Sequence, residues 1–137
     1  GQLVLSALLG GIIGLERAWM RKPAGMRTLM LVGLGSTLFV LVSSRMAGLF
    51  KGAPADPTRI AANVVVGLGF LGAGTIMHAR GSVRGLTTAA TVWVVGAVGL
   101  AVGCGYYAAA VLATLITLLT LHGLDRIERY LVRRRRP

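Results

Sequence analysis

Five apolar stretches follow one another along this chain of 137 residues, separated by short loops. A helix needs about 20 apolar residues to cross the hydrocarbon core of a bilayer. Hydrophobic residues make up 55% of the chain and charged residues only 14%, which is too apolar for an ordinary soluble domain. The sequence therefore predicts an all-α, polytopic membrane protein with five transmembrane helices and no separate soluble catalytic domain.

The third predicted helix has the clearest start. Asp56 can cap exposed N–H groups, and Pro57 suits the first helical turn because its missing N–H costs nothing there. At the other end of the chain, Asp125 and Arg129 are four residues apart, which predicts that the fifth helix continues beyond the membrane. The five helices are expected at residues 2–18, 28–48, 57–77, 85–102 and 106–130.

The distribution of Lys and Arg among the loops indicates the orientation, because cytoplasmic loops retain these residues. The loop after the first stretch, the loop after the third and the C-terminal tail carry 12 of the 15 basic residues, and the opposite side carries Arg45, Lys51 and Arg59. The N-terminus is therefore predicted outside and the C-terminus in the cytoplasm. The chain divides into a transmembrane domain at residues 1–132 and a basic cytoplasmic tail at residues 133–137.

The net charge of +11 and the run Arg133 to Arg136 also fit a nucleic-acid partner. The run follows a membrane span, however, and attraction to anionic lipid of about 1 kcal/mol per basic residue explains it without nucleic acid. A further protein or nucleotide partner for the tail is left open. The expected partners are the lipid bilayer and its anionic lipids, and no nucleic acid is expected.

Glycine recurs at spacings that have two different uses. The letters from Gly67 to Gly72 match a dinucleotide-binding fingerprint, but that site needs a strand-helix-strand unit and an acid about 20 residues further on, which the chain lacks. In lipid, glycine lets helix backbones approach closely, although the third helix could instead be loosened by its glycines. The expected packing glycines are Gly10, Gly14, Gly67, Gly69, Gly72, Gly74, Gly99 and Gly103.

The glycine pairs of the first and fourth helices also bear on oligomeric state. Each pair has the GxxxG spacing that brings two helices together. Five short helices enclose little core, so a homo-oligomer, a dimer with these faces paired across a two-fold axis, is expected.

Polar residues gather at the predicted cytoplasmic ends of the first four helices. Ionisable groups at membrane depth tend to point into a bundle, so we expect Glu16 to bond Arg27 or Arg84, with Arg17 as a further candidate. Alternatively, these arginines reach lipid phosphate and Glu16 is solvated. Arg59 and Asn63, near the outer end of the third helix, fit either a functional role or ordinary helix-end anchoring. The expected functional cluster is Glu16, Arg17, Arg27, Thr28, Arg59, Asn63, Thr75, Arg84, Thr87, Thr88 and Thr91.

Several motifs carry a family resemblance. They are Gly14-Leu-Glu-Arg17, Ala24-Gly-Met-Arg-Thr28 with Leu31-Val-Gly33, Arg59-Ile-Ala-Ala62, Val66-Gly-Leu-Gly-Phe-Leu-Gly-Ala-Gly74 and Val83-Arg-Gly-Leu-Thr-Thr-Ala-Ala-Thr91 with Trp93. In this order, and over most of the chain, they resemble the membrane domain of the MgtC/SapB family. The resemblance implies a multi-pass protein of the bacterial inner membrane, associated with adaptation to magnesium limitation and, in pathogens, with survival inside host cells.

The resemblance implies a regulatory or interaction role, with ATP synthase among the partners. Thr87 stands where the family's virulence factors have Asn, and Val94 where they have Cys, which counts against a virulence role. The alternative is a small transporter or channel for an ion or a phosphate-bearing molecule. Magnesium is poorly supported as cargo because it prefers several oxygen ligands, and the chain offers Glu16 on one side and Asp56 on the other.

Enzyme chemistry is not expected. The chain shows no His-Ser-Asp, paired-acid or metal constellation. His78 and His122 have no Cys, Asp or second His at ligand spacing. We therefore predict no catalytic residue, no cofactor and no bound metal.

Overall fold

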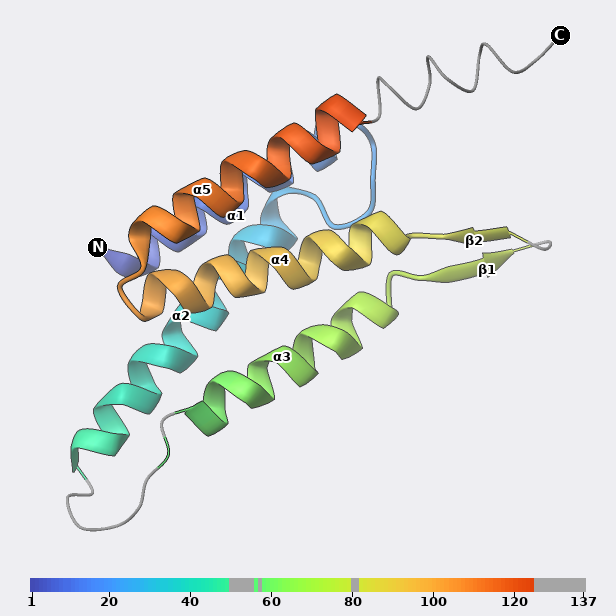
Figure 1. The fold of residues 1–137 in the computed structure, drawn as a ribbon. Helices are drawn as coiled ribbons and strands as arrows, with labels where there is room; N and C mark the ends of the chain where they lie inside the picture. Colours follow the sequence, from blue (N-terminus) through green and yellow to red (C-terminus); the bar gives the residue numbers. More distant parts are fainter. Residues whose placement is uncertain (50–55, 57, 80–81, 125–137) are drawn as a thin grey trace, which may run out of the picture.

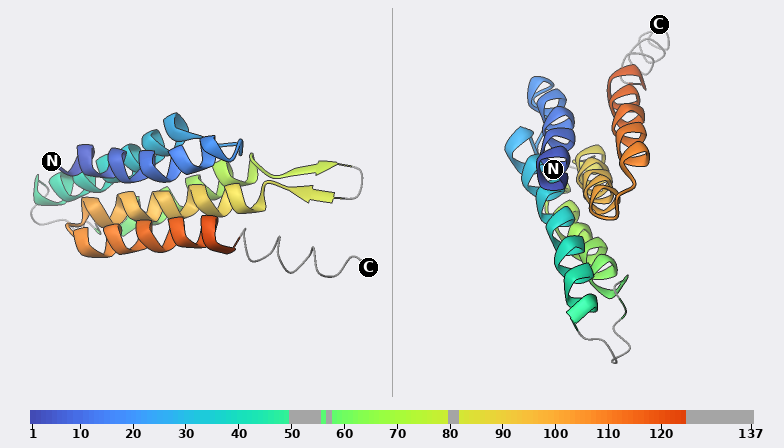
Figure 2. Two further views of the ribbon diagram at one scale, coloured as in Figure 1. Left: turned by 90° about the horizontal axis from the view of Figure 1, so that it is seen from above. Right: turned by 90° about the vertical axis from the view of Figure 1, so that its left-hand side faces the viewer.

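The computed structural model describes residues 1–49, 56, 58–79 and 82–124. In this part the chain forms five α-helices that lie side by side and a two-stranded hairpin that extends beyond one end of the bundle (Figure 1 and Figure 2). The prediction of an all-α bundle is confirmed, and the hairpin is an addition to it. The elements are α1 Gln2–Trp19, α2 Met26–Leu49, α3 Thr58–Ala73, β1 Met77–Ala79, β2 Ser82–Arg84, α4 Leu86–Gly103, α5 Tyr107–Leu119 and a π-helical turn at Thr120–Leu124.

The predicted boundaries agree with α1, α2, α4 and the start of α5 to within two residues. α3 ends at Ala73, four residues earlier than predicted, because residues 74–76 form a turn and Met77 begins β1. β1 pairs antiparallel with β2, with Met77 opposite Arg84. The predicted extension of the fifth helix to residue 130 falls partly on residues 125–130, which lie outside the described residues, as does the tail.

α4 occupies the centre of the bundle, since it contacts each of the other four helices. Among the described residues, α2 and α4 are long and apolar enough to cross a membrane. α3 and the segment Tyr107–Gly123 are apolar but shorter. The helices that pack most extensively on each other, α1 with α2 and α2 with α4, thus include both full-length candidate spans.

Glycines bring α1, α2 and α4 into close backbone contact. A Cβ added to Gly14 would lie 2.5 Å from Met26 Cα, and one added to Gly99 would lie 2.5 Å from the carbonyl oxygen of Gly33. The faces predicted to pair two copies are therefore occupied within one chain, and that part of the dimer prediction is wrong. We call this set of contacts the glycine seam; its members are Gly10, Gly14, Gly33, Gly99 and Gly103.

The glycines of α3 behave differently. A Cβ added to Gly67 or Gly69 would meet nothing within 4 Å, and one added to Gly72 would make ordinary contact with Ala89. α3 is nevertheless a continuous α-helix up to Ala73, so the alternative of a loosened third helix is wrong for these residues. Only Leu68 and Gly72 of α3 are buried.

Aliphatic side chains close the interior between the two ends of the bundle. The buried hydroxyl groups of Ser6, Thr37 and Thr114 donate to backbone carbonyls. The Thr37 hydroxyl donates to the carbonyl oxygen of Gly99 at 2.7 Å and so joins α2 to α4. The buried core cluster consists of Ile13, Leu29, Leu68, Val92 and Val95.

Asp56 caps the start of α3, as predicted. Its Oδ1 accepts hydrogen bonds from the Thr58 N–H at 2.9 Å and from the Thr58 hydroxyl at 2.6 Å. These hydrogen bonds hold the pKa of the Asp56 carboxyl below its usual value of 3.8, and the charge of Arg59 adds a smaller effect. Pro57 lies outside the described residues.

This cap makes the stability of α3 dependent on pH. Because the carboxyl pKa is lower in the folded state, Asp56 stabilises the fold above the usual pKa and loses this effect as the pH falls through the folded pKa. We expect the difference in melting temperature between the wild type and Asp56→Asn to shrink as the pH drops from neutral to below 3.8. A difference that stays constant over this range would contradict the role of the cap.

Candidate functional site

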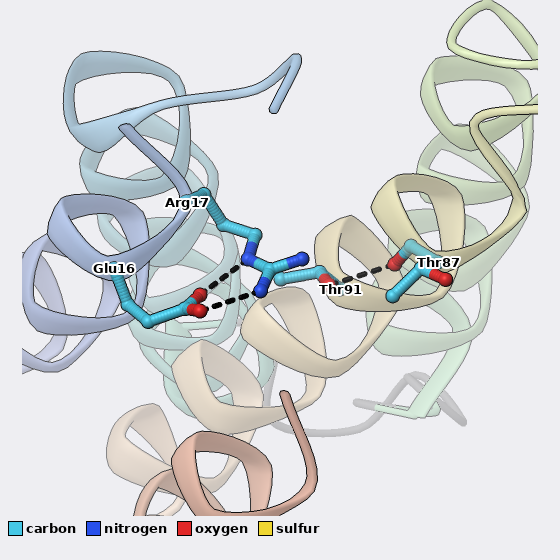
Figure 3. Close-up of polar contacts among 4 residues, drawn as sticks. All are labelled: Glu16, Arg17, Thr87 and Thr91. Atoms are coloured by element: carbon cyan, nitrogen blue, oxygen red, sulfur yellow. Dashed lines mark hydrogen bonds and ion pairs between the residues drawn. The ribbon is translucent and has the colours of Figure 1, made fainter. Parts of the chain in front are cut away.

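Arg17 is buried at the C-terminal end of α1, with 3% of its surface exposed. Its Nε and Nη2 donate to the two carboxylate oxygens of Glu16, the second bond being 2.6 Å long (Figure 3). Glu16 was expected to bond Arg27 or Arg84, and the structure pairs it with its chain neighbour instead. The pair forms because the helix turns the Arg17 side chain toward α4, and its charge needs a buried counter-ion there.

The chain turns back sharply after α1 to begin α2. Arg21 and Ala24 both have positive φ, at 51° and 56°, a conformation that non-glycine residues rarely adopt. The Lys22 N–H donates to the carbonyl oxygen of Arg17 at 2.9 Å. This tight turn holds Lys22 beside the end of α1, close to the buried ion pair.

A cavity of about 840 Å³ opens next to Arg17, between the α1–α2 turn, the hairpin and the start of α4. We call it the hairpin-end cavity. Its lining combines basic side chains and hydroxyl groups with the apolar residues Met77, Val83 and Leu86. Its polar lining residues are Arg17, Lys22, Thr75, Arg84, Thr87, Thr88 and Thr120.

The remaining residues of the predicted cluster lie elsewhere. Thr91 is buried one turn deeper on α4 and donates to the carbonyl oxygen of Thr87 at 2.7 Å. Three others line a second cavity of about 650 Å³ between α2 and α3: Arg27, Thr28 and Asn63. Arg59 is exposed in the first turn of α3.

Lys22, Gly85 and Thr120 line the cavity but were not among the predicted residues. The sequence identifies Lys22 only as one of the basic residues in the loop after the first helix. Gly85 is the N-cap of α4 with φ of 90°, and an added Cβ would clash with the carbonyl oxygen of Thr75. A glycine directly before an apolar helix is the signal that could have identified it.

Comparison with known protein families assigns the chain to one of them. The sequence profile of the MgtC family matches residues 3–130. The chain belongs to the MgtC family. No solved structure matches it.

Relatives from three organisms are similar to most of this chain, and the chain matches a different share of each relative. Protein SrpB of Synechococcus elongatus is 42% identical, covering 93% of this chain and 75% of SrpB. YhiD of Escherichia coli strain K12, whose name gives it a candidate role in magnesium transport, is 44% identical over 88% of this chain and 57% of its own length. Protein MgtC of Salmonella typhimurium is 45% identical over 85% of this chain and 48% of its own length. The chain thus spans between about half and three quarters of these relatives.

Two of the MgtC-family motifs meet at the hairpin-end cavity. The motif ending in Arg17 supplies the buried ion pair, and the motif from Val83 to Thr91 supplies β2 and the first turns of α4. Segments that are far apart in the sequence therefore build one site.

The electrostatics of the cavity favour anions. Glu16 is the one carboxylate that forms an ion pair within the described part of the chain, and its partner is Arg17. Lys22 and Arg84 line the cavity without such a partner. Among the described residues, no group of three or more His, Cys, Asp or Glu side chains could hold a metal ion. The arrangement can bind a negatively charged group through basic side chains and hydroxyls.

Proposed function

We propose that this MgtC-family protein is a five-span protein of the bacterial inner membrane that regulates another membrane protein during adaptation to magnesium limitation. Its N-terminus would lie outside and its hairpin end in the cytoplasm. Figure 2 shows the N-terminus at the opposite end of the bundle from the hairpin. Lys22 and Arg84 at the hairpin end support this orientation, because basic residues are retained on the cytoplasmic side.

The closed interior is the observation that favours regulation over transport. Ile13, Val92 and Val95 are at most 2% exposed and lie between the hairpin-end cavity and the other end of the bundle. An ion crossing a single chain would need polar groups along this path. Exposed apolar faces of α3 and α5, with Phe70 and Leu119 more than 70% exposed, are available instead for contact with lipid or with partner proteins. ATP synthase is among the partners that the family resemblance implies.

A small transporter remains the second candidate, supported by the name of YhiD and by the basic cavity. Magnesium itself fits this cavity poorly. Mg²⁺ prefers near-octahedral oxygen ligands, usually including carboxylates, and the carboxylate of Glu16 is already bonded to Arg17. A transporter of this design would carry an anion.

Flux from proteoliposomes distinguishes the two functions. We expect purified protein to release Mg²⁺, protons, K⁺ or phosphate no faster than protein-free liposomes, because the apolar core blocks the path. Circular dichroism of the reconstituted protein would verify that it is folded. Flux that disappears in Arg84→Gln and persists in Arg45→Gln, a matched exposed arginine on α2, would overturn regulation in favour of transport.

A further inference from the structure

We propose that the hairpin-end cavity is a binding site for a phosphate group, carried either by a soluble molecule or by a lipid headgroup. Its volume of about 840 Å³ lies in the range of small-molecule sites. Phosphate binding here would be compatible with both regulation and transport, so neither needs to be assumed.

The buried guanidinium supplies the first part of the site. Glu16 occupies Nε and Nη2 of Arg17 and thereby fixes the orientation of the guanidinium plane. Figure 3 shows the third nitrogen directed away from Glu16, toward α4 where Thr87 and Thr91 lie. A preorganised arginine costs little entropy on binding, and its planar donors match phosphate oxygens.

The start of α4 supplies the second part. Gly85 caps this 18-residue helix without any side-chain hydrogen bond, and no acidic residue lies in its first turn. Leu86, Thr87 and Thr88 of this first turn all line the cavity. Helix N-termini attract anions because their N–H groups lack intrahelical partners and the helix dipole is positive there. This end of α4, which has no side-chain cap, therefore faces the same space as Arg17.

Two exposed cations supply the third part. Lys22 comes from the α1–α2 turn and Arg84 from β2, so the two side chains reach the cavity from different elements. Neither forms an ion pair within the described residues, so their charges are not neutralised there. With Glu16 bonded to Arg17, the described residues that line the cavity keep an excess of positive charge, which a phosphate dianion would neutralise.

The test is a thermal-shift titration of the full chain in detergent with inorganic phosphate, against chloride at matched ionic strength. We expect phosphate to raise the melting temperature, with an apparent Kd that increases about tenfold in Lys22→Gln and in Arg84→Gln, since each loses a charge-assisted contact. Both side chains are exposed, so these variants should fold, and circular dichroism would verify it. The control is Arg45→Gln, which removes an exposed arginine that does not line the cavity.

A second arm separates the two sources of phosphate. The same proteins are placed in nanodiscs of phosphatidylcholine with or without phosphatidic acid. Stabilisation by phosphatidic acid alone, lost in Lys22→Gln and Arg84→Gln, would identify a lipid headgroup; stabilisation by inorganic phosphate would identify a soluble ligand. If neither probe stabilises the protein, or if Arg45→Gln weakens binding as much as the cavity variants do, the proposed site is wrong.

Discussion

Replacing Gly99 with alanine should lower the free energy of unfolding by about 3 kcal/mol, because a methyl group must be forced into a close-packed contact. The added Cβ would lie 2.5 Å from the Gly33 carbonyl oxygen and 2.8 Å from Ser36 Cβ. Relief would require α2 and α4 to separate, which would also weaken the 2.7 Å hydrogen bond from Thr37 to Gly99. The measurement is denaturant-induced unfolding in mixed micelles, followed by circular dichroism.

Gly67→Ala is the matched control for this prediction. It makes the same chemical change within a helix, but the added Cβ meets nothing within 4 Å. Alanine has a higher helix propensity than glycine, so this variant should be unchanged or up to about 1 kcal/mol more stable. If Gly99→Ala and Gly67→Ala lower the free energy of unfolding equally, the glycine seam does not hold the helices together.

Replacing Glu16 with glutamine should lower the free energy of unfolding by about 3 kcal/mol, because it leaves the Arg17 charge buried without a counter-ion. The side chains of Arg17 and Glu16 are 4% and 12% exposed, so water compensates little. The melting temperature in detergent should therefore fall markedly. An unchanged melting temperature would mean that the Arg17 charge is solvated in the folded protein.

A double-mutant comparison isolates the interaction from other effects of the substitution. Arg17→Met removes the buried charge and keeps an unbranched side chain of similar length. In the Arg17→Met background, Glu16→Gln should lower the free energy of unfolding much less than it does in the wild type, because no unpaired cation remains. The same loss in both backgrounds would assign the effect to Glu16 alone.

The helices were predictable from the sequence, and the hairpin was not. Runs of apolar residues indicate helices by length, and a capping residue such as Asp56 marks where one begins. β1 and β2 have three residues each, too few to show an alternating pattern. The end of α3 was predicted too late for the same reason. Met77 is apolar and therefore fits the helix pattern, and only the hairpin shows that it belongs to β1.

The ion pair and the α3 glycines show the limits of spacing arguments. The expectation that Glu16 bonds Arg27 or Arg84 came from the tendency of ionisable groups at membrane depth to point into a bundle. Side chains next to each other in a helix usually point to different faces. Burial of Arg17 against α4 overrides this rule, and burial depends on packing that spacing does not specify. In the same way, Gly14 lies against a neighbouring helix and Gly67 faces open space, although both belong to similar glycine-rich segments.

Thr75, Thr87, Thr88 and Arg84 of the cavity were predicted because the topology brings several helix ends together, and Thr120 was not. Lys22 was missed because its position depends on the conformation of the α1–α2 turn, which needs positive φ at Arg21 and Ala24. Neither residue type favours this conformation, so the turn cannot be foreseen from local preference.

α3 has fewer buried residues than α1, α2 and α4, and this difference bears on how the bundle unfolds. α1, α2 and α4 approach one another closely along the glycine seam, whereas α3 contributes only Leu68 and Gly72 to the interior. Contiguous segments with little buried contact open at lower free energy than the rest of a protein. We therefore expect α3 to open at a lower free energy than α1, α2 and α4.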